Sequence, residues 1–330
     1  MLKKNILNTL ILLTSIIISL VLVEIFLRIF GYTTFKYSTK PNNEPVTNVY
    51  NEDLGWRPKI GIFQFEPWSN DGKLTTLTSS KNGRVDQIDN PKLQRILFLG
   101  GSFTQGFAVN DNETFVFNLQ EKFKNFNLEN YGVGGYGTYQ NLILLRKLIS
   151  KNKDIKMVIY GYVEHHDVRN IAQDSWLKML FEYSKRGAVE LPYVSLNQDQ
   201  LEEHKSVKYQ KLLLSESSAL IHFIEKKLMY FFSYKRYKNR YVIRNKVIEE
   251  MNNITSKNNI NFINLFLHTS DSNKRKMINY FNQEGIQYAD CNIKKIKSDM
   301  VVKGEGHPNS KTHFNWSQCL ESFLKNNDML

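Results

Sequence analysis

Ser102 follows two glycines at the end of a short apolar run. Residues 96–99 read Ile-Leu-Phe-Leu, which predicts a buried strand, and Gly100 and Gly101 allow a tight turn after it. Such a turn lifts the Ser102 hydroxyl out of the sheet edge, where it can act as a nucleophile. The Ser102 backbone amide is also expected to point towards any oxyanion that forms, because the turn leads into a helix predicted at 113–124, whose first amides are unpaired. The alternative for so short a motif is an ordinary loop after a strand.

A carboxylate and a histidine lie two residues apart near the C-terminus. Glu305 and His307 belong to the glycine-flanked stretch Gly-Glu-Gly-His-Pro-Asn. A serine nucleophile needs a histidine as general base and a carboxylate that orients the imidazole, so this pair supplies what Ser102 lacks. Without that serine, such a pair is more typical of a polar surface turn.

Three glycines after the second predicted strand spell a dinucleotide-binding pattern. Gly132, Gly134 and Gly137 match G-x-G-x-x-G, but that fingerprint belongs to the first strand and turn of its domain. Here an earlier strand precedes the glycines, and Asp154 stands before the next strand instead of at its end. We therefore favour the other use of such glycines, in which the backbone approaches a substrate closely and offers an amide to an oxyanion.

Two adjacent histidines end a third apolar strand. His165 and His166 follow the run 157–160 and precede Asp167. Neighbouring residues of an extended chain point in opposite directions, so the two rings are not expected to share an ion, and no metal site is predicted. One ring directed at Ser102 can donate a hydrogen bond, whereas a polar surface residue is the plainer alternative.

The elements that must hold these residues alternate along the chain. In order they are strand 95–99, helix 113–124, strand 128–131, helix 139–150, strand 155–162, helix 241–256, strand 260–267, helix 271–283, strand 286–288 and a last helix 316–325. Alternation of this kind predicts an α/β fold, a three-layer sandwich with a central parallel sheet. Ligands bind such sheets beyond the carboxyl ends of the strands, where Ser102 is expected.

The N-terminus is predicted to anchor the chain in a membrane. Residues 6–23 are almost continuously apolar and long enough to span a bilayer, and no small-x-small cleavage site follows them. A buried core helix is the alternative. Lys3 and Lys4 precede the span, so the positive-inside rule makes 1–31 a cytoplasmic tip and transmembrane anchor and places the rest of the chain outside the cytoplasm.

Composition narrows the classes of partner. The 44 Lys and Arg against 32 Asp and Glu give a net charge of +12, spread along the chain without a nucleic-acid-binding motif, so no nucleic acid is expected as a partner. A basic surface near anionic lipid is the simpler account. Cys291 and Cys319 would lie in an oxidising space, and the sequence leaves both their pairing and the oligomeric state open.

Two segments complete the predicted organisation. Residues 32–91 are polar and proline-rich with short aromatic runs, typical of a stalk followed by hairpins at a sheet edge. The main domain is expected at 92–330, with an insertion at about 171–240. The charged run 225–227 inside this insertion excludes a second membrane span there. We interpret the insertion as a cap that forms a wall of the pocket, and a helix pair packed away from the substrate is the alternative.

In this order and spacing, the motifs resemble the SGNH or GDSL-type hydrolases that carry an N-terminal membrane helix. The family's Gly-Asp-Ser-x-Thr-x-Gly block corresponds to residues 100–106, with glycine where Asp is commonest. The glycine donor of the second block falls on Gly135, and the Asn of the third block is replaced by His166. The Asp-x-His of the last block becomes Glu305-Gly-His307.

This resemblance implies a flavodoxin-like SGNH fold and a serine esterase without metal or organic cofactor. It implies Ser102 as nucleophile, His307 as general base and Glu305 as the orienting carboxylate. The implied oxyanion donors are Ser102, Gly135 and His166. The expected substrates are O-acyl esters of surface or exported glycans, such as O-acetyl groups. An O-acyltransferase that uses the same residues and a catalytically inactive glycan-binding relative are the alternatives.

Overall fold

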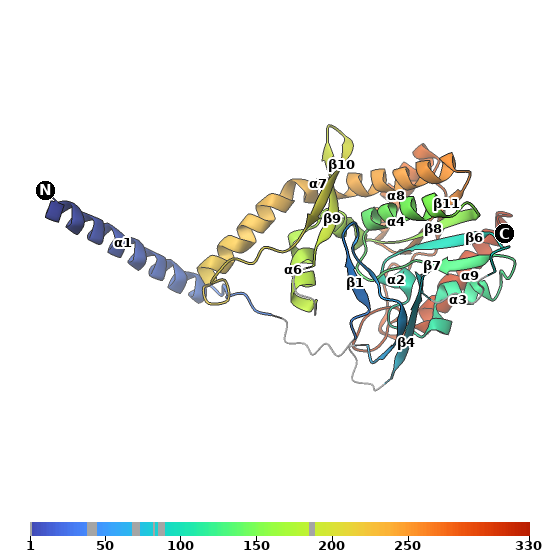
Figure 1. Ribbon diagram of the computed structural model, residues 1–330, viewed down its shortest axis with the longest axis horizontal. Coiled ribbons are helices and arrows are strands. Elements are labelled where there is room, and N and C mark those ends of the chain that lie inside the picture. Colours follow the sequence, from blue (N-terminus) through green and yellow to red (C-terminus); the bar gives the residue numbers. More distant parts are fainter. Residues whose placement is uncertain (1, 38–44, 68–72, 82, 85–89, 185–188) are drawn as a thin grey trace.

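The computed structural model describes residues 2–37, 45–67, 73–81, 83–84, 90–184 and 189–330. A long helix, α1 (Leu2–Ile29), projects from an α/β body that contains the sheet and the C-terminus (Figure 1). Within the described residues, the part of α1 from Lys4 to Ile29 is the one helix long and apolar enough to cross a membrane. The helix predicted as the anchor is therefore present.

An eight-stranded sheet forms the centre of the body, and its strands lie in the order β12, β11, β8, β6, β7, β5, β4, β3. The strand bounds are β3 Gly61–Phe65, β4 Thr75–Ser80, β5 Gly83–Arg84, β6 Arg95–Gly100, β7 Asn127–Asn130, β8 Ile155–Val163, β11 Asn261–His268 and β12 Tyr288–Asp290. The strands from β12 to β7 are mutually parallel. Taken along the chain, these parallel strands have the 2-1-3-4-5 order of flavodoxin-like folds, which confirms the predicted fold class.

Helices cover both faces of this sheet. They are α3 (Phe115–Gln120), α4 (Thr138–Lys151), α7 (Ala219–Lys257), α8 (Asp271–Glu284) and α9 (Ser310–Asn326). In β6, Leu97 and Leu99 join the apolar cluster formed with α4, α7 and α8, whereas Ile96 and Phe98 join the cluster formed with α3 and α9. Side chains alternate across a strand, so the two cores hold β6 from both sides. Ser102 follows the carboxyl end of this fixed strand.

The segment before residue 92 adds strands at the sheet edge. β3, β4 and β5 continue the sheet beyond β7 with antiparallel pairing, and a separate hairpin consists of β1 (Asn48–Asn51) and β2 (Gly55–Pro58). The buried Arg84 of β5 pairs with Asp111 at 2.9 Å and donates to the backbone oxygen of Gln105 at 2.8 Å. β5 precedes residue 92 and β7 follows it, and the two strands pair in one sheet. The residues on either side of the boundary expected at 92 therefore belong to one folded unit.

The insertion consists of a helix, a hairpin and half of a longer helix. These are α6 (Asp174–Tyr183), β9 (Leu191–Asn197) paired with β10 (Gln200–Val207), and the first half of α7. The helix predicted at 241–256 is the second half of α7, which runs without interruption from residue 219 because no glycine or proline breaks it. The expected end of the insertion at residue 240 therefore lies inside a helix.

Two other helix predictions were wrong in their bounds, and capping explains both. The helix predicted at 113–124 is a 3₁₀ turn, Asp111–Glu113, followed by α3, whose first turn is capped by Thr114 at 3.1 Å. The last helix begins at Ser310 instead of residue 316 because the Asn309 side chain accepts a hydrogen bond from the amide of Thr312 at 3.1 Å.

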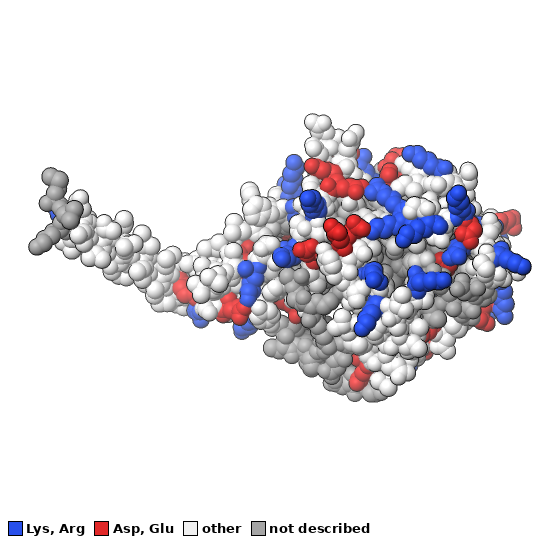
Figure 2. Space-filling model, viewed as in Figure 1, with Lys and Arg blue, Asp and Glu red and all other residues white. Residues whose placement is uncertain are grey.

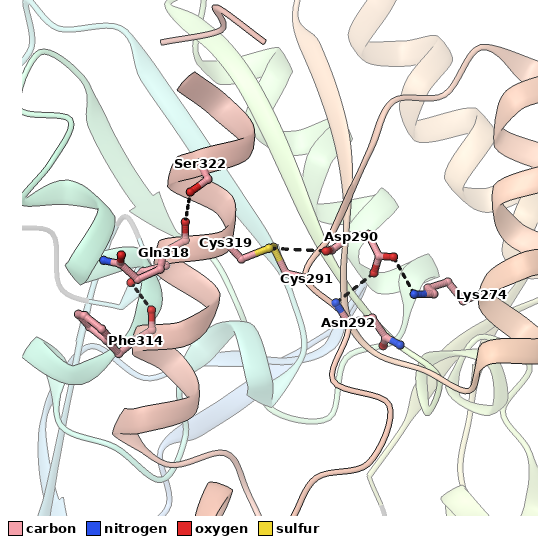
Figure 3. The surroundings of a disulfide bond; sticks show 9 residues. Lys274, Asp290, Cys291, Asn292, Phe314, Gln318, Cys319 and Ser322 are labelled. Carbon is pink, nitrogen blue, oxygen red and sulfur yellow. Dashed lines mark hydrogen bonds and ion pairs between the residues drawn. A yellow bond between two sulfur atoms is a disulfide. The ribbon is translucent and has the colours of Figure 1, made fainter. Parts of the chain in front are cut away.

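A disulfide bond joins the end of the sheet to the last helix. Cys291, directly after β12, is bonded to Cys319 of α9, and their Cα atoms lie 5.8 Å apart (Figure 3). The structure thus assigns a partner to both cysteines, which the sequence left open. The bond fixes α9, which follows the loop that carries His307, to the end of the outer parallel strand.

Candidate active site

Ser102, His307 and Glu305 form one hydrogen-bonded series at the carboxyl end of β6. The Oγ atom of Ser102 lies 2.9 Å from Nε2 of His307. The other ring nitrogen of His307, Nδ1, contacts the Glu305 carboxylate, and that carboxylate also accepts the backbone amide of His307 at 2.6 Å. The Glu305 side chain is only 5% exposed, so its contacts fix the ring orientation. A serine, a histidine and a carboxylate in this arrangement can perform nucleophilic acyl transfer.

The hydroxyl of Ser102 is presented by a short helix that the sequence did not predict. α2 (Ser102–Gln105) begins at the serine itself. The unpaired amides next to Ser102 are therefore those of the first turn of α2 and not those of the predicted helix 113–124. Thr104 of α2 lies directly over Gly100 and Gly161, where any larger residue would collide with it. α2 therefore packs closely on β6 and β8, and the Ser102 amide is left without an intrahelical partner.

Gly135 supplies a second free amide beside Ser102. Its φ is +85°, and a Cβ atom there would lie 2.9 Å from the Trp56 ring, so both the conformation and the space require glycine. The neighbouring Gly134 is held on both sides, because its amide donates to Gln105 at 2.9 Å and its carbonyl accepts from Trp56 at 3.0 Å. No hydrogen-bond partner for the Gly135 amide occurs among the described residues.

His166 is buried and lies in a helical turn, not on the extended chain that the sequence suggested. It begins α5 (His166–Arg169), and its Nδ1 atom lies 2.6 Å from the hydroxyl of Tyr160. Its Nε2 atom faces Gly101, where an added Cβ would be only 2.6 Å away. Burial holds the pKa of His166 well below its ordinary value, and the nearby Arg169 acts in the same direction, so the ring is neutral.

A buried ion pair holds α5 in place beneath the site. The carboxylate of Asp167 lies 3.1 Å from Arg244 of α7 and accepts a hydrogen bond from Tyr162 at 2.9 Å. Burial raises the pKa of Asp167 to about 6, although the Arg244 charge opposes this rise. Removing either partner would leave an uncompensated buried charge. The long helix α7 therefore fixes the turn that carries His166.

Arg169 lines both cavities beside Ser102, although no sequence motif predicted it there. Its guanidinium donates to the backbone oxygen of Tyr136 at 3.1 Å and lies 4.5 Å from the ring centre of Trp176. No carboxylate of the described residues lies within ion-pair distance of it, and burial lowers its pKa to about 10. The only sequence signal was its position three residues after His166, which places both side chains on one face of a helix.

Two cavities meet at the nucleophile. The larger, about 510 Å³, is lined mainly by apolar and aromatic side chains, among them Trp56 of the edge segment, Phe107 after α2, and Trp176, Met179 and Leu180 of the insertion. The smaller, about 300 Å³, is more polar and is lined by His165, His166, His268 and Glu305. Ser102, Arg169 and His307 line both cavities. An ester bond placed at Ser102 therefore has a separate space for each of its two halves.

Across the described residues, no group of three or more His, Cys, Asp and Glu side chains is arranged to hold an ion. His165 is exposed and His166 is buried, although both line the smaller cavity.

Comparison with known proteins finds solved structures with a similar fold. No family model and no curated protein sequence matches the chain. The fold is similar to the crystal structure of TesA, with a TM-score of 0.41 and 10% identity over 71% of this chain and 99% of that one. It is similar to a GDSL-like lipase from Bacteroides thetaiotaomicron, with a TM-score of 0.39 and 12% identity over 71% and 89% of the two chains. It is also similar to the psychrotrophic esterase EstA from Pseudoalteromonas sp., with a TM-score of 0.41 and 13% identity over 71% and 97%.

Proposed function

We propose that this chain is a membrane-anchored serine esterase of the SGNH or GDSL type that acts on O-acyl esters of surface or exported glycans. The observation that carries the proposal is the series Ser102, His307 and Glu305, whose contacts suit a nucleophile, its general base and the orienting carboxylate. The free amides of Ser102 and Gly135 and the ring of His166 are the proposed oxyanion donors.

The reaction proceeds in two acyl transfers. Nε2 of His307 removes the proton of Ser102 as Oγ attacks the ester carbonyl carbon, and the oxyanion donors hold the negative oxygen that results. The C–O bond to the alcohol then breaks, and His307 returns its proton to the leaving oxygen. Water attacks the acyl-enzyme with His307 again as the base, which releases the carboxylic acid and restores Ser102. No metal or organic cofactor takes part in this scheme.

The proposal is tested by turnover of nitrophenyl acetate by the full-length protein in detergent, followed by product analysis with and without an acceptor glycan. An esterase releases acetate in both conditions. An O-acyltransferase that uses the same residues produces an acylated acceptor, because the sugar hydroxyl replaces water in the second step. A glycan-binding relative retains affinity for the glycan and shows no turnover, which would refute the proposal.

The larger cavity leads to a prediction about the acyl group. We expect kcat/KM for nitrophenyl octanoate to exceed that for the acetate by roughly ten- to fiftyfold, because burying only two or three of the added methylenes contributes about 0.8 kcal/mol each. Met179→Trp, which fills part of the cavity, should remove most of this preference and leave acetate hydrolysis unchanged. Preference for the acetate in the parent protein would instead assign the aromatic cavity to the alcohol half of the ester, such as a sugar ring.

The proposed location gives a second prediction. Because Lys3 and Lys4 precede the span, a phosphatase fused after Leu330 should be active outside the cytoplasm, and protease added to intact spheroplasts should degrade the body. The Cys291 to Cys319 disulfide should form in the same cells, since such bonds persist in oxidising compartments. Protection from protease, together with free thiols, would reverse the orientation and remove the basis for a surface glycan as substrate.

A further inference from the structure

The first half of α7 is apolar on the side that faces away from the body. Its inward side chains are buried, namely Ala219, His222, Glu225 and Ser233. The outward side chains recur at i, i+4, i+7 and i+8, namely Ile224, Leu228, Phe231 and Phe232. Phe231 is 74% exposed and Phe232 is 64% exposed. A helix that already buries one face does not normally present adjacent phenylalanines to water on the other.

This apolar face begins at the end of the candidate membrane helix. The carboxylate of Glu24 in α1 accepts hydrogen bonds from the first amides of α7, at 2.9 Å from Ala219 and 2.8 Å from Leu220. Arg28 of α1 donates to the backbone oxygen of Ser217 at 2.9 Å. A carboxylate at a helix N-terminus satisfies free amides and favours the helix dipole. The start of α7 is thus attached to the last turns of α1.

The direction of α7 suits a helix that lies on a bilayer. Figure 1 shows that the first half of α7 leaves the junction at a steep angle to α1 instead of continuing its axis. With α1 along the bilayer normal, this half of α7 runs along the membrane surface. Its charged side chains exclude a second span, but a helix that lies in the interface requires one apolar face with Lys beside it.

The charges around the apolar face match an anionic lipid surface. Lys227, Lys235 and Lys238 lie on the same half of α7, and lysine stems extend along apolar surface while their ammonium groups reach headgroups. The loop that packs on α7 adds Leu213, which is 86% exposed, and the amide of the adjacent Leu212 donates to Glu225 at 2.7 Å. In Figure 2, α1 is white along most of its length, and the charged side chains of the viewed face gather on the body and at the junction.

We propose that the outward face of α7, defined by Ile224, Leu228, Phe231 and Phe232, lies in the lipid and water interface and forms a second membrane attachment. This inference rests on the proposed anchoring by α1. α7 also contacts α6, through Ser233 and Asp174 at 3.3 Å, and α6 carries Trp176 and Met179 of the larger cavity. The interfacial attachment therefore holds one wall of the cavity at a fixed height above the bilayer, so that esters presented at the membrane surface reach Ser102.

The test uses the full-length protein in bilayer nanodiscs of phosphatidylcholine and phosphatidylglycerol. Because Cys291 and Cys319 are bonded to each other, a cysteine introduced at Phe232 can be labelled selectively with a polarity-sensitive fluorophore. Phe314→Cys, at an exposed phenylalanine of α9, is the matched control away from α7, and Leu12→Cys in α1 is the control for insertion. Two quenchers are used, phosphatidylcholine spin-labelled near its headgroup for residues 232 and 314 and phosphatidylcholine spin-labelled on its acyl chain for residue 12.

We expect the label at residue 232 to lose about half of its emission or more, as at residue 12, while the label at residue 314 stays close to its value without quencher. Quenching at residue 12 combined with a label at 232 that behaves like the one at 314 would overturn the interfacial attachment and leave the anchor intact. Absence of quenching at residue 12 would overturn the anchor and the attachment together. Nitrophenyl acetate turnover by each labelled protein reports the proposed esterase activity independently of both results.

Discussion

Replacing Ser102 with alanine should abolish both ester hydrolysis and covalent labelling by a fluorophosphonate. The Oγ atom lies 2.9 Å from Nε2 of His307, and alanine leaves that base without a proton to remove. Loss of the serine from a triad of this kind lowers kcat by a factor of about 10⁴ or more. Hydrolysis of nitrophenyl acetate and detection of the labelled band measure the two effects on the same preparation.

The matched control is Ser322→Ala, which removes an exposed hydroxyl from α9. That hydroxyl bonds only locally, to the backbone oxygen of Gln318 at 2.9 Å, so activity and labelling should stay at the parent level. Glu305→Gln keeps the side-chain volume but removes the charge that stabilises the His307 cation, so it should also lower kcat strongly. Labelling that persists in Ser102→Ala would place the nucleophile elsewhere and refute the assignment.

The arrangement of the sheet was predictable because local patterns determine it. The apolar runs that became β6, β8 and β11 are short, continuous and separated by helical periodicity, and these features are sufficient to predict a parallel sheet with helices on both faces. The bounds of α9 were harder to predict, because an Asn309 side chain starts that helix six residues before its apolar pattern begins. A cap formed by one polar side chain does not change the spacing of the apolar residues, which is the pattern from which a helix is predicted.

The hydrogen-bonded series of Ser102, His307 and Glu305 was predictable for a different reason. Ser102 and His307 stand in short motifs whose chemistry is recognisable in isolation, and both lie where strands or strand-to-helix loops end. Trp56 and Arg169 were not predictable in this way. Trp56 comes from an edge hairpin far from the serine in sequence, and Arg169 lacks a carboxylate partner among the described residues, so only the folded chain brings them to Gly135.

Gly101 and His166 also differ from the family pattern together, and the fold gives the reason. A Cβ atom at residue 101 would lie 2.6 Å from Nε2 of His166, so a side chain at the first position and a ring at the second compete for one space. The resemblance places Asp at the first position and the smaller Asn at the second. Read along the sequence, the two replacements look like separate losses, whereas in the structure the imidazole occupies volume that Gly101 leaves free.

Substitutions of His166 should show whether this ring donates to the oxyanion. Because Nδ1 is bonded to the Tyr160 hydroxyl at 2.6 Å, the role requires a proton on Nε2 and therefore donation from Tyr160 to Nδ1. The Tyr160 hydroxyl has a second partner, the Thr138 hydroxyl at 2.9 Å, so donation to Nδ1 requires Thr138 to be the donor in that pair. His166→Ala should lower kcat by roughly a hundredfold with little change in KM, because the donor acts on charge that develops in the transition state. His166→Asn keeps a donor and should retain substantial activity.

The expected loss of kcat in His166→Ala must be distinguished from a loss of stability, because His166 is buried. His166→Ala also leaves a cavity that destabilises the fold, so Tm is measured for each variant, and a fall in Tm with unchanged kcat would reduce His166 to a packing role. Tyr160→Phe removes the hydroxyl that selects the tautomer and should lower kcat by about tenfold, the loss of one hydrogen bond. His165→Ala is the matched control, since His165 lines the same cavity but is exposed. If His165→Ala loses activity and His166→Ala does not, the neighbouring ring is the donor and the correspondence with the third family block shifts by one residue.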